Sequence, residues 1–451
     1  MATSKLDHHD QASPLTKPLN FIFSGKTAKN RLLKAAMTER ISSWGDATHL
    51  NKRGVASKAL VNLYRRWGQG GYGVIVTGNI MIDYEHVECP GNLIIPRDAP
   101  FHRLRFRRLE QLAAEAKRDG SLIVAQVSHP GRQVEDYVQR FPVSASDVQL
   151  VMRQGGATYG KPRAMDQADI NDVIEGFAHA AEYLYKAGFD GIQLHAAHGY
   201  LLAQFLSLTT NKRTDQYGGS LSNRARLIFE ISDAIKTRVP STFIISIKVN
   251  SVEFQPGGFN VQECKDLCIQ LEQRGFDFIE ISGGTYEDFG FVHKKESTRK
   301  REAFFLEFAD MIIPSLCQTR GYVTGGLRSA TAMAKALDSV DGVGIGRPCC
   351  HEPDIGKRLL NDTSKVAART LISSDELGID ILACGAQMRL IGLDKQPLDF
   401  GRKDHYNAFK REMVKYMDEK ANDPRHFKSG CVKIGNVGLK PYGTSYTALS
   451  I

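Results

Sequence analysis

Eight short apolar runs alternate with longer helical patterns along the chain, and this alternation constrains the fold more than any other feature. The runs begin at Leu32, Val74, Leu122, Gly191, Phe243, Phe278, Tyr322 and Gly342. Runs that are apolar at nearly every position are typical of parallel strands buried on both faces. Eight βα units over about 330 residues predict an α/β fold, a (β/α)8 TIM barrel with inserted loops. A doubly wound sheet shares the alternation, but eight repeats favour the barrel.

The predicted helices have recognisable ends. We expect one helix to run from Asp169 to a stop at Gly188, and another to begin after Asn260 as N-cap and stop at Gly275. A third ends in the same way at Gly120. The phrase "GFDGIQL" at Gly188 returns almost unchanged as "GFDFIEI" at Gly275, which indicates that one βα unit has been used more than once.

The ends of the chain lack this alternation. We expect residues 1–17 to form a flexible tail, residues 18–355 the barrel, and residues 356–451 a helical C-terminal extension. The extension contains the amphipathic stretch "DHYNAFKREMVKYMDEKAND". It is predicted to pack on the barrel or on a partner subunit, in a monomer or a homodimer.

Apolar runs, charge and cysteine content limit the kinds of partner, cofactor and location that the chain could have. No apolar run approaches the roughly 18 residues of a membrane span, and no secretory signal is evident at the start. The net charge of +9 is spread along the chain, so no nucleic-acid partner is predicted; "HKKESTRKRE" indicates a solvated loop that could attract an anionic cofactor such as NADPH. Eight cysteines without any C-x-x-C argue against a zinc ribbon or an iron–sulfur cluster and predict reduced thiols in a cytoplasmic protein.

One glycine motif is misleading. "GQGGYG" (residues 68–73) satisfies the G-x-G-x-x-G pattern of dinucleotide sites. Such a fingerprint follows a strand and opens a helix, whereas these glycines follow a helical segment and precede a strand. We interpret them as a helix-to-strand turn, so the chain shows no separate nicotinamide-binding domain.

Glycines at the ends of the last two strands are typical of a phosphate site. In TIM barrels the loops after strands seven and eight commonly bind phosphate. Gly325, Gly326 and Gly346 would offer backbone amides there, and Arg347 could pair with the phosphate in bidentate fashion. Tight turns with a surface arginine are the alternative.

The segment "HAAHGY" places His195, His198 and Tyr200 at the end of strand four, on the catalytic face of such a barrel. The pair could ligate a metal, but no third ligand is evident nearby. It could also satisfy buried backbone groups. As catalytic groups, two imidazoles could both donate to one oxygen that gains negative charge, and a neighbouring phenol could give a proton.

The longer segment "HAAHGYLLAQFLSLTTNKRTDQYGGSLSNRARL" closely resembles the signature of the old yellow enzyme family of FMN-dependent ene-reductases. The resemblance covers roughly residues 18 to 355. It implies that His195 and His198 bind the carbonyl or nitro oxygen of the substrate, and that Tyr200 protonates the α-carbon. It also implies a row of flavin contacts: Ala36, Met37, Thr38, Gly78, Gln126 and Lys248.

The roles implied for these contacts are specific. Thr38 would bond near flavin N5, Gly78 would leave room for the ring, and Gln126 would pair with the pyrimidine edge. Lys248 stands where the family usually has arginine; it keeps the charge near N1 but loses the planar fork. Arg40 replaces an aromatic pocket residue of part of the family, and Tyr286 is expected to face the substrate.

The resemblance implies two half-reactions at one site. NADPH or NADH reduces the flavin and leaves, and an α,β-unsaturated carbonyl or nitroalkene then takes hydride from N5 and a proton from Tyr200. Three alternatives stay open at this point. They are a flavin barrel that oxidises another small molecule, a metal-dependent barrel hydrolase in which the histidine pair ligates zinc, and a barrel without activity that serves as a binding module.

Overall fold

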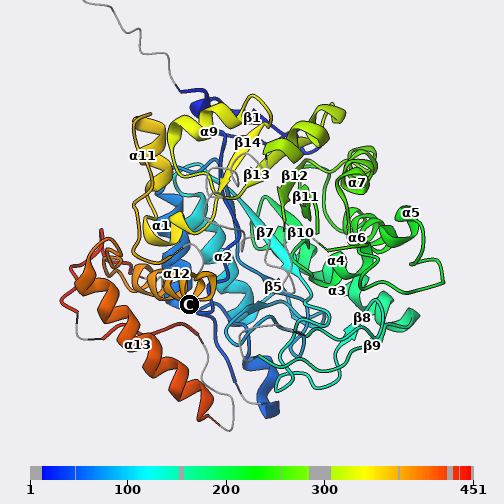
Figure 1. The fold of residues 1–451 in the computed structure, drawn as a ribbon, viewed down its shortest axis with the longest axis horizontal. Helices are drawn as coiled ribbons and strands as arrows, with labels where there is room; N and C mark the ends of the chain where they lie inside the picture. The colour runs from blue at the N-terminus through cyan, green and yellow to red at the C-terminus, as the bar shows by residue number, and fades with distance from the viewer. Residues whose placement is uncertain are drawn as a thin grey trace, which may run out of the picture.

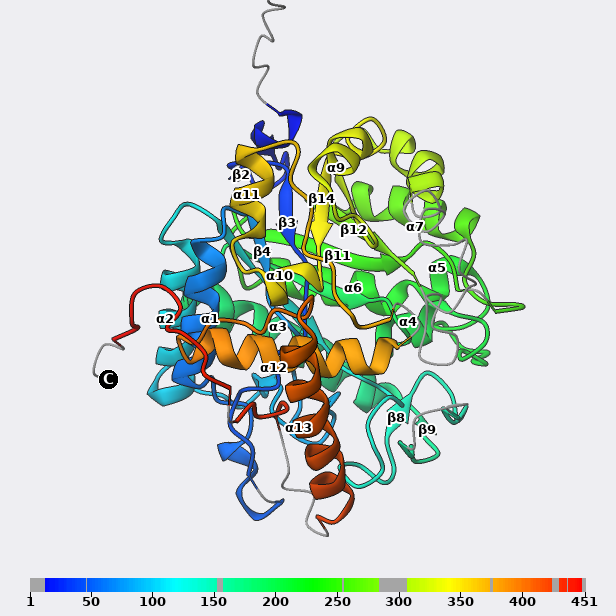
Figure 2. The ribbon, with the colours of Figure 1, turned by 60° about the vertical axis from the view of Figure 1, so that its left-hand side comes forward.

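The structure is a computed structural model, and it describes residues 13–45, 47–151, 157–253, 255–283, 306–373, 376–423, 430–435 and 437–447. At its centre eight parallel strands form a closed barrel, seen in the middle of Figures 1 and 2. In barrel order they are β3 (Leu32–Lys34), β4 (Val74–Val76), β7 (Leu122–Ser128), β10 (Gly191–Ala196), β11 (Ile244–Asn250), β12 (Phe278–Ser282), β13 (Arg320–Thr324) and β14 (Gly342–Ile345). All eight predicted strands are present, and the barrel is confirmed over the doubly wound sheet.

Two pairings close the barrel. β14 pairs with β3, and β7 pairs with β10 as well as with β4. Nearly every residue of these strands is buried, as their continuous apolar character predicted. Because all strands run in parallel, their carboxyl ends meet at one rim, where the loops place polar side chains.

Helices cover the outside of the barrel in chain order (Figure 2). They are α1 (Lys58–Gly68), α2 (Arg103–Lys117), α3 (Gln167–Lys186), α6 (Arg226–Lys236), α7 (Val261–Gln273), α9 (Ala330–Ala336), α10 (Pro348–His351) and α11 (Ile355–Asn361). The first glycine of "GQGGYG" is the last residue of α1, and the rest of the motif forms the turn 69–73 that leads into β4. The predicted helix-to-strand turn is therefore confirmed.

The helix ends follow the sequence closely. Asn260 caps α7 by accepting hydrogen bonds from the amides of Gln262 and Glu263, and Gly275 has φ +70° just beyond its end. The predicted start of α3 was wrong by two residues. The helix begins at Gln167, because Asp166 is its N-cap and forms a capping box with Asp169, the residue at which the start was expected.

Short elements lie in the loops at both ends of the barrel. They are η1 (Pro14–Thr16), β1 (Leu19–Asn20), β2 (Thr27–Ala28), η2 (Ala47–Lys52), β5 (Ile80–Met81), β6 (Leu93–Ile94), β8 (Val143–Ser144), β9 (Arg163–Ala164), α4 (Leu201–Leu206), α5 (Leu221–Arg224) and η3 (Ile313–Ser315). β8 and β9 form a small sheet of their own, and β1 pairs with β2.

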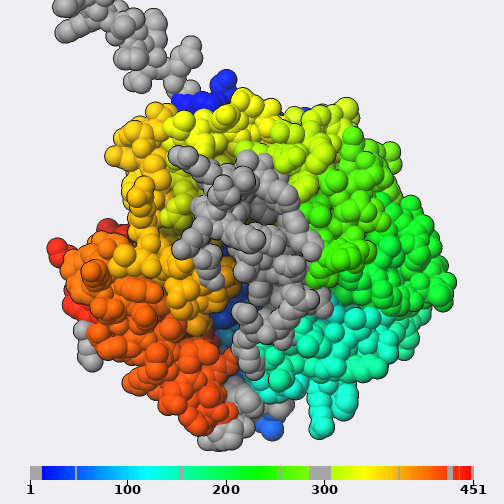
Figure 3. Space-filling model, in the orientation of Figure 1, coloured from blue at the N-terminus to red at the C-terminus, as the bar shows by residue number. Residues whose placement is uncertain are grey.

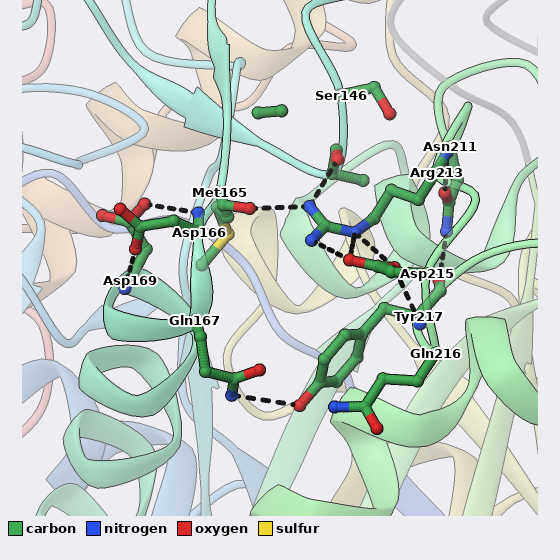
Figure 4. A network of polar contacts seen from close by, with 12 residues as sticks. Ser146, Met165, Asp166, Gln167, Asp169, Asn211, Arg213, Asp215, Gln216 and Tyr217 are labelled. Carbon is green, nitrogen blue, oxygen red and sulfur yellow. Dashed lines mark hydrogen bonds and ion pairs between the residues drawn. The ribbon is translucent and has the colours of Figure 1, made fainter.

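The segment "NKRTDQYGGSLSNR" serves as a structural tie (Figure 4). Arg213 donates to the carbonyl of Met165 at 2.7 Å and pairs with Asp215, which in turn accepts from the amide of Tyr217 at 3.0 Å. The Tyr217 hydroxyl accepts from Gln167 at 3.3 Å. These residues join the loop after α4 to β9 and α3, which gives this polar segment a packing role.

The C-terminal extension adds α12 (Leu377–Gly392) and α13 (Lys403–Ala421), coloured orange and red along one side of the molecule in Figures 1 and 3. α12 packs against α1 and α10. Asn62 on α1 donates to the carbonyl of Gly392 at 3.0 Å, and the thiol of Cys431 donates to the carbonyl of Glu39 at 3.0 Å. The extension therefore reaches the end of β3, close to the barrel rim. Within the part of the chain that the structure describes, no helix is both long and apolar enough to cross a membrane.

Candidate active site

His195 lies near the carboxyl end of β10, where the barrel opens. Its backbone is level with Lys248 on β11, and its side chain is buried. Its Nδ1 lies 3.2 Å from the hydroxyl of Ser128 and 3.1 Å from Oδ1 of Asn79. Two neighbouring strand ends therefore fix the ring and leave Nε2 facing the loop that follows β10.

That loop brings His198 back toward His195. His198 has φ +57°, and Gly199 has φ +75°, so two successive residues adopt a left-handed backbone. This conformation is costly for a residue other than glycine. Here the amide of His198 donates to Oδ1 of Asn250 at 3.2 Å, and its Nε2 lies 2.9 Å from the hydroxyl of Ser282. The turn places Nδ1 of His198 3.4 Å from Nε2 of His195.

Tyr200 completes the group that the sequence predicted. Its ring lies 4.2 Å from the His195 ring, centroid to centroid, and it is buried. Asn79 Nδ2 donates to the Tyr200 hydroxyl at 3.2 Å. One carboxamide thus contacts both His195 and Tyr200.

Both imidazoles are held neutral. Burial, followed by the nearby His198 and Lys248, lowers the pKa of His195 well below its ordinary value. Burial and the charge of Lys248 lower the pKa of His198 to about 3. Neutral rings can each donate one N–H and accept at the other nitrogen, which suits them to bind a substrate oxygen.

A line of polar side chains crosses the barrel beside His195. Gln126 donates to Gln193 at 2.7 Å, and Gln193 donates to Glu280 at 2.8 Å. Glu280 also pairs with Lys248, whose Nζ lies 2.8 Å from its Oε1. Burial opposes ionisation, but Lys248 and the hydrogen bonds hold the pKa of Glu280 below its usual range. Lys248, which the family resemblance places near flavin N1, is therefore paired with a buried carboxylate.

The end of β3 lies next to this line. Ala36, Met37 and Thr38 are half-buried, although the strand before them is buried. Gly78, at the end of β4, faces Glu39: a Cβ at Gly78 would lie 2.2 Å from the Glu39 carboxylate. The room that Gly78 leaves on its Cβ side is thus occupied by Glu39, whose pKa is raised by burial.

The glycines after β13 and β14 have the backbone freedom that the sequence suggested. Gly325 has φ +147° and Gly326 has φ +77°, and both lie at the surface of the rim. Gly346 has only Met37 Sδ near the position of a Cβ, at 3.6 Å. Arg347 donates to Asp380 of α12 at 2.6 Å. The predicted phosphate side chain thus has a protein partner in this structure.

The structure describes one of the two further substrate contacts that the sequence suggested. Arg40 has φ +56°, and its guanidinium pairs with Glu88 at 2.5 Å, beside the C-terminal segment. Tyr286 lies outside the described residues. Neither residue has been tested as a substrate contact, and both remain predictions.

Comparison with known proteins adds the decisive observation. The NADH:flavin oxidoreductase / NADH oxidase family matches residues 14–365 of the chain. The NADH-dependent flavin oxidoreductase nadA of Aspergillus parasiticus is 46% identical over 415 residues, which is 91% of this chain and 93% of that protein. The chain belongs to the NADH:flavin oxidoreductase, or old yellow enzyme, family.

Other relatives agree. The NADH-dependent flavin oxidoreductase iliE of Hypocrea jecorina is 33% identical over 371 residues, 77% of this chain and 90% of that protein. The old yellow enzyme homologue from Zymomonas mobilis has the same fold, with a TM-score of 0.63 at 22% identity over 80% of this chain and 95% of that chain. The family resemblance and the enzyme class are therefore confirmed: the chain is a flavin oxidoreductase. The family assignment replaces two of the alternatives that the sequence left open, the metal-dependent barrel hydrolase and the binding module without activity.

Sequence reasoning missed three polar residues of this flavin oxidoreductase. Asn79, Glu39 and Glu280 all contact predicted site residues. A signal existed for Glu280, which is the single charge inside the apolar run "FIEIS". Asn79 directly follows Gly78 at a strand end, where polar side chains reach the rim. Glu39 carried no local signal.

Proposed function

We propose that this flavin oxidoreductase binds FMN across the barrel rim and uses NADH or NADPH to reduce activated C=C bonds of α,β-unsaturated carbonyls or nitroalkenes. The observation that carries the proposal is the His195–His198 pair, two neutral imidazoles whose nitrogens face each other at 3.4 Å beside the phenol of Tyr200. The names of nadA and iliE support NADH as the donor.

The residues at the rim fit FMN. Gly325 and Gly326 have positive φ and carry no side chain of their own, which would let a phosphate approach their backbone amides closely. Ala36 and Met37 leave half-buried surface at the end of β3, as expected where a planar ring covers a strand end. Asn250 adds a buried donor: its Nδ2 has no hydrogen-bond partner among the residues that the structure describes.

The side chains would act together on the substrate. When bound, FMN supplies hydride transfer at N5 to the β-carbon of the alkene. His195 Nε2 and His198 Nδ1 would hold the carbonyl or nitro oxygen and stabilise the negative charge that develops on it, and one such donor is typically worth about 3 kcal/mol. The Tyr200 hydroxyl would give a proton to the α-carbon. Asn79 would hold the side chains of His195 and Tyr200 in fixed positions relative to each other through its two hydrogen bonds.

Lys248 and Glu280 define the electrostatic setting of this reaction. The pair is close to neutral overall, since the Lys248 ammonium lies 2.8 Å from the Glu280 carboxylate. Lys248 would therefore support the reduced flavin less than an unpaired cation would. This favours a flavin with a comparatively low reduction potential.

The first experiment is a spectral titration of the purified enzyme without oxygen. NADH should bleach the flavin absorbance, and cyclohexenone or a nitroalkene should restore it. The flavin that heating releases from the protein should be identified as FMN by chromatography. NADPH in a parallel titration decides between the two donors.

Two outcomes would contradict the proposal. Bleaching by NADH with recovery only in air would point to an oxidase that passes electrons to oxygen, while the family assignment would stand. Bleaching by an alcohol in place of NADH would point to a dehydrogenase of hydroxy compounds.

A further inference from the structure

Three side chains with metal-binding chemistry converge where the extension meets the barrel. His351 is the last residue of α10, while Asp380 and Cys384 are four residues apart on α12 and so share one helix face. The His351 Nε2 atom lies 3.7 Å from Cys384 Sγ and 3.6 Å from Asp380 Oδ1. The three ligand atoms all lie within 4.8 Å of one another.

The two distances from His351 Nε2 match those around a tetrahedral zinc ion. Zinc binds nitrogen and oxygen at about 2.0–2.2 Å and thiolate sulfur at about 2.3 Å, which separates a nitrogen and a sulfur ligand by about 3.6 Å and a nitrogen and an oxygen ligand by about 3.4 Å. A thiolate, an imidazole and a carboxylate are all established zinc ligands. The side chain of Cys384 is almost fully buried, and those of His351 and Asp380 are 10% and 15% exposed.

His351 and Asp380 each have a further polar contact on the side that faces away from the cluster. The Nε2 atom of Gln387 lies 3.4 Å from His351 Nδ1, and two hydrogen bonds to the backbone of Leu398 fix this amide, so it limits the orientation of the His351 ring without accepting a proton from it. Arg347 donates to Asp380 Oδ2 at 2.6 Å, on the carboxylate oxygen that does not face His351. Metal-binding carboxylates commonly have a partner such as Arg347, because it orients the ligand.

We propose that His351, Asp380 and Cys384 bind zinc or a chemically similar divalent ion, which fastens α12 of the extension to α10 at the end of the barrel. The fourth position is open to the thiol of Cys350, which is buried beside Cys384, or to water. Asp380 also pairs with Arg347, the predicted phosphate residue, but none of the three ligands has a role in the proposed flavin reaction, so the proposal stands or falls independently of the proposed function.

The test uses the flavin-loaded enzyme from cells grown with added zinc. After dialysis against metal-free buffer, elemental analysis should find one zinc per chain. Cys384→Ser and Asp380→Asn should reduce this to traces, while Cys317→Ser, which changes an exposed thiol, should retain the full content. Added zinc should raise the Tm of the chelator-treated wild type and leave the Tm of Cys384→Ser unchanged.

Cobalt substitution identifies the ligands and does not depend on a variant that folds. Co²⁺ in the wild-type site should show a thiolate-to-cobalt charge-transfer band and the intense red d–d bands of tetrahedral cobalt, which lie beyond the flavin absorption. A second cluster, Asp83, His86 and His129, also has ligand atoms within 4.8 Å of one another but contains no sulfur. Cobalt bound without a thiolate band would assign the ion to that cluster and overturn the proposal. The proposal would also be overturned if the wild-type protein retained no zinc and added zinc did not raise its Tm.

Discussion

The Nε2 atom of His195 and the Nδ1 atom of His198 lie 3.4 Å apart, with their rings nearly perpendicular at 81°. Two N–H donors at this separation can both reach one oxygen, because each hydrogen bond is about 2.9 Å long. The arrangement depends on the left-handed backbone of His198, which turns the chain back toward β10. A single substrate oxygen would replace the contact between the rings.

Replacing His195 by alanine should weaken phenol binding and slow flavin reoxidation by an enone. One preorganised donor to a developing oxyanion is typically worth about 10²–10³ in rate. Flavin reduction by NADH should change much less, since no negative charge develops on an oxygen in that step. Stopped-flow measurement of the two half-reactions separates them. Equal slowing of both would mean that His195 positions the flavin and does not bind the substrate oxygen.

Tyr200→Phe should slow reoxidation by an enone by roughly 10²–10⁴-fold if the phenol is the general acid. The substitution keeps the ring that packs against His195 at 4.2 Å, so the fold should be unaffected. Phenol binding, which needs no proton transfer, serves as the control and should stay close to wild type. An unchanged oxidative rate would remove Tyr200 from the proton-donor role.

Asn79→Asp tests how the tautomer of His195 is set. Asn79 contacts both His195 Nδ1 and the Tyr200 hydroxyl. The Asn79 amide can rotate to present its NH2 group to His195 Nδ1, which leaves the imidazole proton on Nε2. A carboxylate can only accept hydrogen bonds, so it would hold the His195 proton on Nδ1 and leave Nε2 without a proton to donate. Phenol affinity should fall by about 10²-fold. Asn79→Ala, which adds no charge, should cost less; an equal loss in both variants would mean that only packing is affected.

The histidine pair should make the protein less stable in acid. The folded-state pKa of His198 is lowered to about 3, whereas an unfolded histidine titrates near about 6.5. The unfolded chain therefore binds more protons between these values, and stability present above about pH 6.5 is lost as the pH falls. The loss is at most about 1.4 kcal/mol per pH unit for each group.

Urea unfolding between about pH 8 and pH 5 measures this dependence. His198→Gln should show a flatter profile than the wild type on the acid side, because one titrating group is removed. The two profiles should run parallel above about pH 7. Identical slopes throughout would show that His198 is not held neutral in the folded protein.

Glu280→Gln should raise the reduction potential of the bound flavin. The substitution removes the carboxylate that lies 2.8 Å from Lys248 and leaves the cation free to stabilise a negative charge on the reduced flavin. Removing one partner of a buried pair also costs stability, about 3–5 kcal/mol. The double variant Glu280→Gln, Lys248→Met is the matched control, since it removes both charges. A potential that does not move in Glu280→Gln would show that Lys248 lies too far from the flavin to act on it.

The local patterns of the sequence were sufficient for the barrel. Eight apolar runs became eight buried strands, and the glycine stops at Gly120, Gly188 and Gly275 all have positive φ. Burial on both faces and the left-handed stop are properties of a few neighbouring residues, so they can be recognised without the tertiary structure. The N-terminal boundary of α3 was misjudged, because the N-cap is Asp166, three residues before the expected start at Asp169.

The sequence by itself also determined the family and the identity of the histidine pair, since His195, His198 and Tyr200 lie within six residues of one another. Only the tertiary structure decided what surrounds them. Asn79 comes from β4's end, more than a hundred residues away, and Glu280 pairs with Lys248 only because β11 and β12 are neighbours in the barrel. The same holds for Arg347, which is paired by Asp380 of the extension. Hydrogen bonds and ion pairs of this kind depend on distances between strands and helices that are far apart in sequence, and only closure of the barrel and docking of the extension on it set those distances.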